Sequence, residues 1–236
     1  MKKGKLYLIP TTLGGLDGIE KVLPTYNISV IHQIDEFVVE QLRTARRFLS
    51  KIKHPKPIDS LTFHELNKHT DENHIISYLN ALSEGKSIGL LSEAGTPCVA
   101  DPGAVIVQIA HEKNIEVIPL IGPNSIILAL MASGFNGQHF TFHGYLPVDT
   151  QTLTKKLKEI ESNSRYLKQT QIFIETPYRN NKLLSKLKSV CKPDTKICVA
   201  TNLTLEDEFI KTKEIRQWKK ETVDLHKKPT VFLLYF

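Results

Sequence analysis

Short apolar segments alternate with amphipathic ones along the first half of the chain. Four segments have the length and composition of strands, at residues 6–9, 36–40, 87–91 and 116–120. Between them, apolar residues recur at helical spacing at residues 43–52, 71–84 and 103–113, and a further helix starts at Ile19 and breaks at Pro24. Strands that alternate with helices are typical of parallel sheets, so this pattern predicts an α/β fold.

The second half of the chain also mixes strands with helices, but it differs in charge and in strand character. We expect strands at residues 140–145, 171–175, 196–200 and 231–236, and helices at 125–132, 155–161 and 179–190. The difference between the halves predicts two α/β domains, residues 1–119 and 120–236.

Three strand-to-helix loops are candidate ligand sites, because ligands of open α/β sheets bind beyond the carboxyl ends of the strands. The most unusual is Ser92–Gly103, whose two glycines, two prolines and two carboxylates exceed the needs of an ordinary connection, which is the alternative. Pro119–Ser125 fits a helix cap as well as a binding loop, and Pro10–Gly15 is the third candidate. The chain has no Walker loop, no dinucleotide-binding glycine fingerprint and no Gly-x-Ser-x-Gly elbow of a hydrolase.

Charge is distributed unevenly along the chain. The net charge of +6 divides into −1 for residues 1–118, with 13 basic and 14 acidic side chains, and +7 for residues 119–236, with 18 and 11. A basic half favours an anionic partner such as RNA, and the alternative is a solvated lysine-rich surface.

The composition, 41% hydrophobic and 24% charged, excludes a disordered tail, a collagen-like repeat and a disulfide scaffold. The longest apolar run, Ile126–Ala132, has seven residues, far fewer than the roughly 20 that span a bilayer, so we expect no membrane partner. The three cysteines lack metal-ligand spacing, which predicts reduced thiols in a cytoplasmic protein without a metal.

Six motifs follow one another in order along nearly the whole chain. They are Leu6–Thr11, Leu91–Gly103, Pro119–Pro123, Ala132–Gly134, Phe142–Pro147 and Glu175–Arg179. The segment Ser92–Gly103 is the most specific of them. In this order they resemble the tetrapyrrole methylase superfamily of S-adenosylmethionine (SAM)-dependent methyltransferases, and within it the ribosomal RNA small subunit methyltransferase I branch.

The resemblance implies a fold of two α/β domains with SAM in the cleft between them, in a protein that usually forms a homodimer. It also implies methylation of a cytidine ribose 2′-oxygen in RNA of the small ribosomal subunit. The residues that the resemblance assigns to SAM binding are Pro10, Leu13, Glu93, Ala94, Gly95, Thr96, Val99, Asn124, Ser125 and Asn202, with Glu175 also contributed by the second domain.

Methyl transfer to a hydroxyl needs an aligned donor and a base or proton path. Glu40, Glu93 and Glu175 are candidate bases, and Arg43 or Arg179 could hold a phosphate or carboxylate of the substrate. From these we expect Glu40, Arg43 and Glu175 to be catalytic. The structural alternatives are a Glu40–Arg43 pair on a helix shoulder and a Glu175 that only orients the following helix.

Three segments depart from the pattern of the branch, one of them Lys227–Pro229, which reads Lys-Lys-Pro in place of the usual Lys-Gly-Glu. Glu40–Arg43 reads Glu-Gln-Leu-Arg where the branch usually carries Glu-Asp-Thr-Arg, and Ala200–Leu205 lacks the usual Arg, Glu and Lys. Two alternative functions therefore stay open: a methyltransferase for a small, tetrapyrrole-like molecule, and a non-catalytic relative that binds SAM or RNA.

Overall fold

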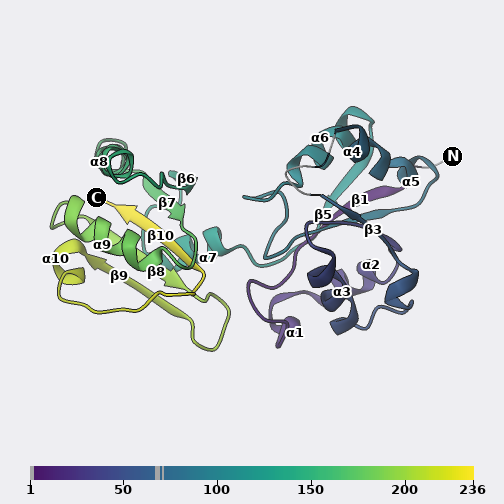
Figure 1. The fold of residues 1–236 in the computed structure, drawn as a ribbon, viewed down its shortest axis with the longest axis horizontal. Helices are drawn as coiled ribbons and strands as arrows, with labels where there is room; N and C mark the ends of the chain where they lie inside the picture. The colour runs from purple at the N-terminus through teal and green to yellow at the C-terminus, as the bar shows by residue number, and fades with distance from the viewer. Residues whose placement is uncertain (1–2, 67–69, 71) are drawn as a thin grey trace. The chain divides into compact units, whose positions relative to one another are not determined.

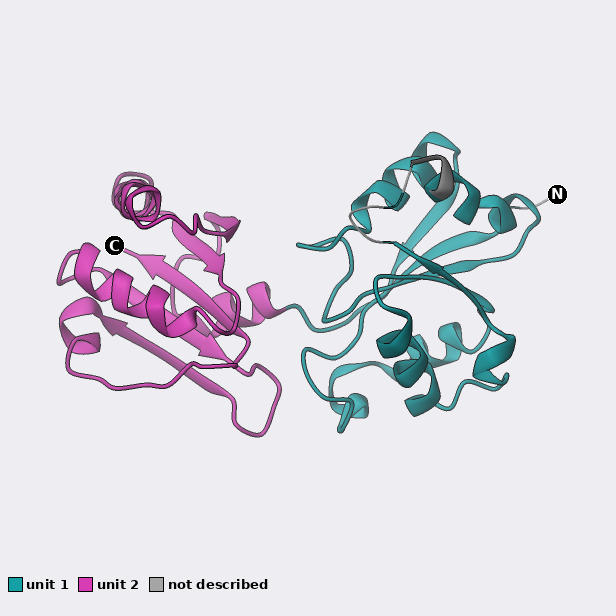
Figure 2. Ribbon diagram, in the orientation of Figure 1, with its two compact units in different colours: residues 1–124 teal, residues 125–236 magenta. Residues whose placement is uncertain are grey.

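A computed structural model describes residues 3–66, 70 and 72–236, which form two compact units, residues 1–124 (unit 1) and 125–236 (unit 2) (Figure 2). That residues 1–119 and 120–236 fold as independent domains stays a prediction. Among the described residues, no helix combines the length and apolar content needed to cross a membrane.

Unit 1 is built on a parallel sheet of five strands (Figure 1). The strands are β1 (Lys5–Ile9), β2 (Glu36–Val39), β3 (Thr62–Glu65), β4 (Ile88–Leu91) and β5 (Glu116–Pro119). Their order in the sheet is β3-β2-β4-β1-β5, and every neighbouring pair is parallel. This parallel sheet confirms the predicted α/β class. Its apolar strands, such as the fully buried β4, need cover on both faces.

Helices cover both faces of this sheet. They are α1 (Ile19–Val22), α2 (Thr25–Ile31), α3 (Leu42–Lys51), a 3₁₀ turn (Ile58–Ser60), α4 (Glu72–Tyr78), α5 (Asn80–Ser83) and α6 (Ala104–Glu112). On one face, Phe37 packs with α2 and α3; on the other, Val38 packs with α4 to α6. The predicted helix 71–84 corresponds to α4 and α5, with residue 71 outside the described residues.

Unit 2 contains a mixed sheet of five strands. Its elements are α7 (Ser125–Ser133), β6 (Phe140–Tyr145), α8 (Thr150–Leu167), β7 (Thr170–Ile174), α9 (Asn180–Val190), β8 (Lys196–Thr201), β9 (Phe209–Glu214), α10 (Ile215–Trp218) and β10 (Thr230–Tyr235). The order is β6-β7-β10-β8-β9, in which only the β6–β7 pair is parallel.

The core of unit 2 follows the alternation of its strands. Phe173, Ile197 and Phe232 point to one face, where α8, α9 and α10 cover them. The helix α7 packs against β9 and β10, and the Thr212 hydroxyl donates to the Ser133 carbonyl at 2.8 Å. Both faces are therefore buried, as in the first sheet.

Two strands were not expected from the sequence, and both lie at sheet edges. The strand β3 is short, and β9 reads Phe-Ile-Lys-Thr-Lys-Glu, with lysines of the kind that protect an exposed edge. Such strands lack a clear apolar pattern. The helix α8 also extends well beyond the predicted 155–161, because Asp149 caps it and Leu153 continues its apolar face.

Candidate functional site

Three loops meet at the carboxyl ends of β1, β4 and β5 in unit 1. The central strand β1 pairs with both β4 and β5, so the segments that follow these strands emerge side by side. The Thr11 amide donates to the Gly95 carbonyl at 3.0 Å, and the Gly95 amide donates to the Thr12 carbonyl at 3.2 Å. The first and second loops are thus joined backbone to backbone.

Two glycines allow these loops to approach one another closely. Gly95 has φ +70°, and a Cβ there would lie 2.8 Å from both the Pro123 carbonyl oxygen and the Leu13 Cδ2. A Cβ on Gly122 would lie 2.3 Å from the Pro10 ring. All three loops therefore pack in contact, and the sequence achieves this with residues that lack a side chain.

Side chains further fix the second loop. The Asn124 amide donates to the Thr96 hydroxyl at 2.6 Å, which links it to the third loop. The Asp101 carboxylate accepts from the amides of Gly103 at 2.7 Å and Cys98 at 3.2 Å. Burial, together with Asp101, raises the pKa of Cys98 to about 11, so its thiol stays protonated at neutral pH and is no nucleophile there.

Most of the residues predicted to bind SAM lie on these loops. Leu13, Gly95, Thr96 and Asn124 belong to the contacts just described, and Ala94 is exposed on the second loop. The other residues of this predicted set in unit 1 are Pro10, Glu93 and Val99, the last of which is 44% exposed.

Two residues of the predicted SAM set belong to unit 2. Ser125 is the first residue of α7. Asn202 follows β8 with φ 50°, and its amide donates to the Asp207 carboxylate at 2.6 Å. The structure thus gives Asn202 a local role in its turn, and the assignment to SAM stays a prediction.

A cavity of about 180 Å³ lies beside the first loop and α3. Glu93 lines it, and its carboxylate accepts from the Thr44 hydroxyl at 2.6 Å. Because Val39 of β2 pairs with Leu91 of β4, the next residues of both strands, Glu40 among them, reach the same sheet edge. The sequence carries no local signal for Thr44, since its partner is 49 residues away.

Glu40 and Arg43, both predicted to be catalytic, lie at this edge, between the end of β2 and the first turn of α3. The structure therefore gathers Glu40, Arg43 and Glu93 at the carboxyl edge of one parallel sheet. Among the residues that the structure describes, no three His, Cys, Asp or Glu side chains converge to hold a metal ion.

Glu175, the third residue predicted to be catalytic, follows β7 in unit 2. Its side chain is only 4% exposed, and it accepts from the Arg179 guanidinium at 2.5 Å and from the Thr176 amide at 2.7 Å. Both carboxylate oxygens are therefore engaged, as expected for a residue that orients the start of α9.

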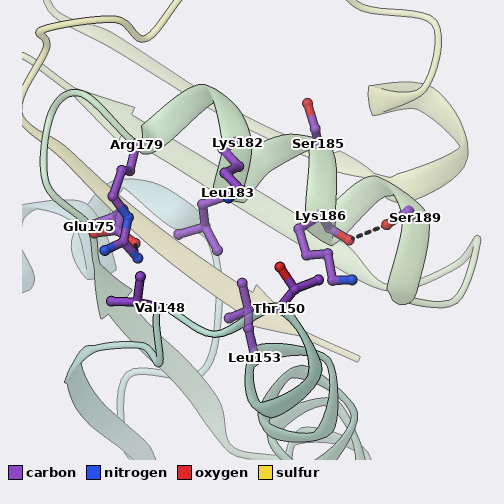
Figure 3. A pocket seen from close by; sticks show the side chains of 10 residues that line it. All are labelled: Val148, Thr150, Leu153, Glu175, Arg179, Lys182, Leu183, Ser185, Lys186 and Ser189. Carbon is purple, nitrogen blue, oxygen red and sulfur yellow. Dashed lines mark hydrogen bonds and ion pairs between the residues drawn. The ribbon is translucent and has the colours of Figure 1, made fainter.

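Glu175 and Arg179 also line a cavity of about 250 Å³ between α8 and α9 (Figure 3). Lys182 and Lys186 line it as well. These lysines were not among the predicted site residues, although their spacing from Arg179 by three and seven positions places all three on one helix face.

Comparison with known proteins gives one family over most of the chain. The sequence profile of the family described as Tetrapyrrole (Corrin/Porphyrin) Methylases matches residues 5–218. The chain is 31% identical to the ribosomal RNA small subunit methyltransferase I of Vibrio cholerae, over 98% of this chain and 76% of that protein. It is 33% identical to the protein of the same name from Bacillus subtilis, over 92% of this chain and 71% of that protein.

Solved structures share the fold at low sequence identity. The crystal structure of diphthine synthase superposes with a TM-score of 0.68 at 14% identity, over 98% of this chain and 90% of that one. This likeness confirms the predicted α/β class, with two sheets.

Proposed function

Because the chain belongs to the tetrapyrrole (corrin/porphyrin) methylases and is a SAM-dependent methyltransferase, we propose that it methylates a ribose 2′-oxygen in RNA of the small ribosomal subunit. The observation that carries this proposal is the 31% identity to a ribosomal RNA small subunit methyltransferase I over 98% of the chain. The net charge of +7 on residues 119–236 supports a polyanionic substrate.

The three loops of unit 1 are suited to hold SAM, which supplies a methyl group already activated on a sulfonium. Their close packing at Gly95 and Gly122 fixes the loop backbone before any ligand arrives, which lowers the cost of binding. The residues of unit 1 that would hold the donor are Pro10, Leu13, the segment from Glu93 to Val99, and Asn124. The proposed contacts from unit 2 are Ser125 and Asn202.

Glu40 and Glu93 are the residues proposed to accept the proton of the substrate hydroxyl. Both side chains are exposed at the sheet edge, whereas Glu175 is buried and its two oxygens accept from Arg179 and a backbone amide. We therefore assign Glu175 a positioning role, and Arg43 the task of pairing with a substrate phosphate.

A methyl-transfer assay with radiolabelled SAM tests the substrate. Small ribosomal subunits, naked ribosomal RNA and a porphyrinogen are offered in parallel, and methyl incorporation into ribose of the subunit or its RNA is expected. Incorporation into the porphyrinogen alone would instead support a small-molecule methyltransferase, and no incorporation despite SAM binding would support a non-catalytic relative.

The same assay identifies the base. Replacing the true base with its amide, Glu40→Gln or Glu93→Gln, should reduce turnover about 100-fold or more, with SAM affinity in calorimetry kept. Glu112→Gln on α6 is the matched control, because this carboxylate is also exposed and accepts a hydrogen bond from Gln108 in the preceding turn of the same helix. Full turnover of both variants would remove these carboxylates from the role.

The assembly and location follow from the same proposal. A ribosomal substrate implies a cytoplasmic protein, and the family resemblance implies a homodimer. Light scattering of the purified chain, which has a mass of 26.7 kDa, distinguishes one copy from two.

A further inference from the structure

The cavity between α8 and α9 carries an excess of positive charge. Its wall holds three cationic side chains, those of Arg179, Lys182 and Lys186, and one carboxylate, that of Glu175. Arg179 and the Thr176 amide already satisfy that carboxylate, so the two lysines supply the remaining charge.

Among the described residues, no ion pair neutralises the charge of either lysine. Over residues 3–66, 70 and 72–236, the ion pairs include neither Lys182 nor Lys186. Asp149, which caps α8, accepts at its Oδ1 from the amide and the hydroxyl of Thr152 at 2.8 and 2.7 Å, and it forms no ion pair with either lysine. Two such cations beside a hollow favour an anionic ligand.

The rest of the wall fits one part of a nucleotide. Thr150, the first residue of α8, contributes a hydroxyl, and the N-terminus of this 18-residue helix adds a positive dipole. Leu153 faces the α9 side chains across the hollow (Figure 3), and Val148, 67% exposed, offers an apolar surface for a ribose or base.

The volume of the cavity limits the ligand. About 250 Å³ is below the roughly 300–1,000 Å³ of pockets that enclose a whole small molecule, so one group of a larger ligand fits best. We propose that this cavity binds a backbone phosphate of RNA, with Lys182 and Lys186 as its cationic ligands. The proposal rests on the proposed function for its source of phosphate, because a free phosphate would offer the same chemistry.

Binding of a fluorescent single-stranded RNA, measured by anisotropy over a range of salt concentrations, tests the site. The variant is Lys182→Gln/Lys186→Gln. The control is Lys219→Gln/Lys220→Gln, which removes the same charge from exposed lysines of unit 2 that do not line the cavity.

The cavity variant should bind RNA at least about tenfold more weakly, because one charge-assisted hydrogen bond contributes about that factor and the variant removes two lysines. The slope of log K against log salt should become shallower by about 0.7 for each RNA phosphate that the variant no longer neutralises. Lys182→Arg/Lys186→Arg should restore most of the affinity. Equally weakened binding in the cavity and control variants would overturn the site, since it would reflect overall charge alone.

A second arm separates the two sources of phosphate. Inorganic phosphate is titrated into the wild type and the cavity variant, with thermal unfolding followed by the fluorescence of Trp218, the single tryptophan, which lies in the same unit. Stabilisation of the wild type by millimolar phosphate, with RNA binding unchanged in the variant, would assign the cavity to a free anion and overturn the RNA proposal.

Failure of the proposed function is visible separately. If SAM gives no heat in calorimetry but the cavity variant still binds RNA more weakly than the control, the phosphate site stands and the methyltransferase assignment to RNA falls. If methylation proceeds and the variant binds RNA as the control does, only the cavity proposal falls.

Discussion

Replacing Gly95 with alanine should disrupt the junction of the three loops. The residue has φ +70°, where an alanine costs about 1–2 kcal/mol of backbone strain. Its Cβ would also lie 2.8 Å from the Pro123 carbonyl oxygen, a backbone atom, and relieving that overlap adds about 1–3 kcal/mol. The expected destabilisation of unit 1 is therefore about 2–5 kcal/mol.

Two other glycines separate these contributions. Gly134 has φ +74° but open space at its Cβ position, so Gly134→Ala should show strain alone, about 1–2 kcal/mol. Gly15 has open space and no left-handed φ, so Gly15→Ala should change stability by about 0.5 kcal/mol or less.

Each unit needs its own measurement. Hydrogen exchange of the amides in β1 and β4 reports on unit 1 for Gly95→Ala and Gly15→Ala, and Trp218 fluorescence reports on unit 2 for Gly134→Ala. SAM affinity in calorimetry should fall for Gly95→Ala. If Gly95→Ala destabilises unit 1 no more than Gly134→Ala destabilises unit 2, close loop packing is not what requires this glycine.

Three further predictions concern single side chains. The pKa of the Cys98 thiol is raised to about 11, so this thiol should react with iodoacetamide at pH 8 about 100-fold more slowly than an ordinary thiol. Its reaction rate should still rise above pH 9, and a plateau there would contradict the raised pKa. Thr44→Val should cost the roughly 0.5–1.5 kcal/mol of the hydroxyl bond to Glu93, whereas Thr44→Ser, which keeps the hydroxyl, should cost less in the same urea titration. Arg179→Met leaves the buried Glu175 carboxylate without its cation and should lower the free energy of unfolding by up to about 3 kcal/mol, measured by tryptophan fluorescence. Adding Glu175→Gln should restore part of that stability. Strictly additive losses in the double variant would refute the coupling between the two side chains.

Local patterns were sufficient for the elements that lie inside the two sheets. The buried strand β4 and the amphipathic helix α3 carry their signals within a few consecutive residues, because burial on one or both faces sets the period of apolar positions. The edge strands β3 and β9 were missed, since an edge exposes much of its surface and favours polar residues such as lysine.

The sequence by itself determined the strand–helix alternation, the three loops and their resemblance to one methyltransferase family. It did not determine which side chains would meet, because that depends on sheet order and helix packing. Only the folded chain brings Thr44 to Glu93, and only there do Lys182 and Lys186 of α9 line one cavity with residues of α8. Secondary structure depends on neighbours along the chain, whereas a site depends on contacts between residues far apart in it.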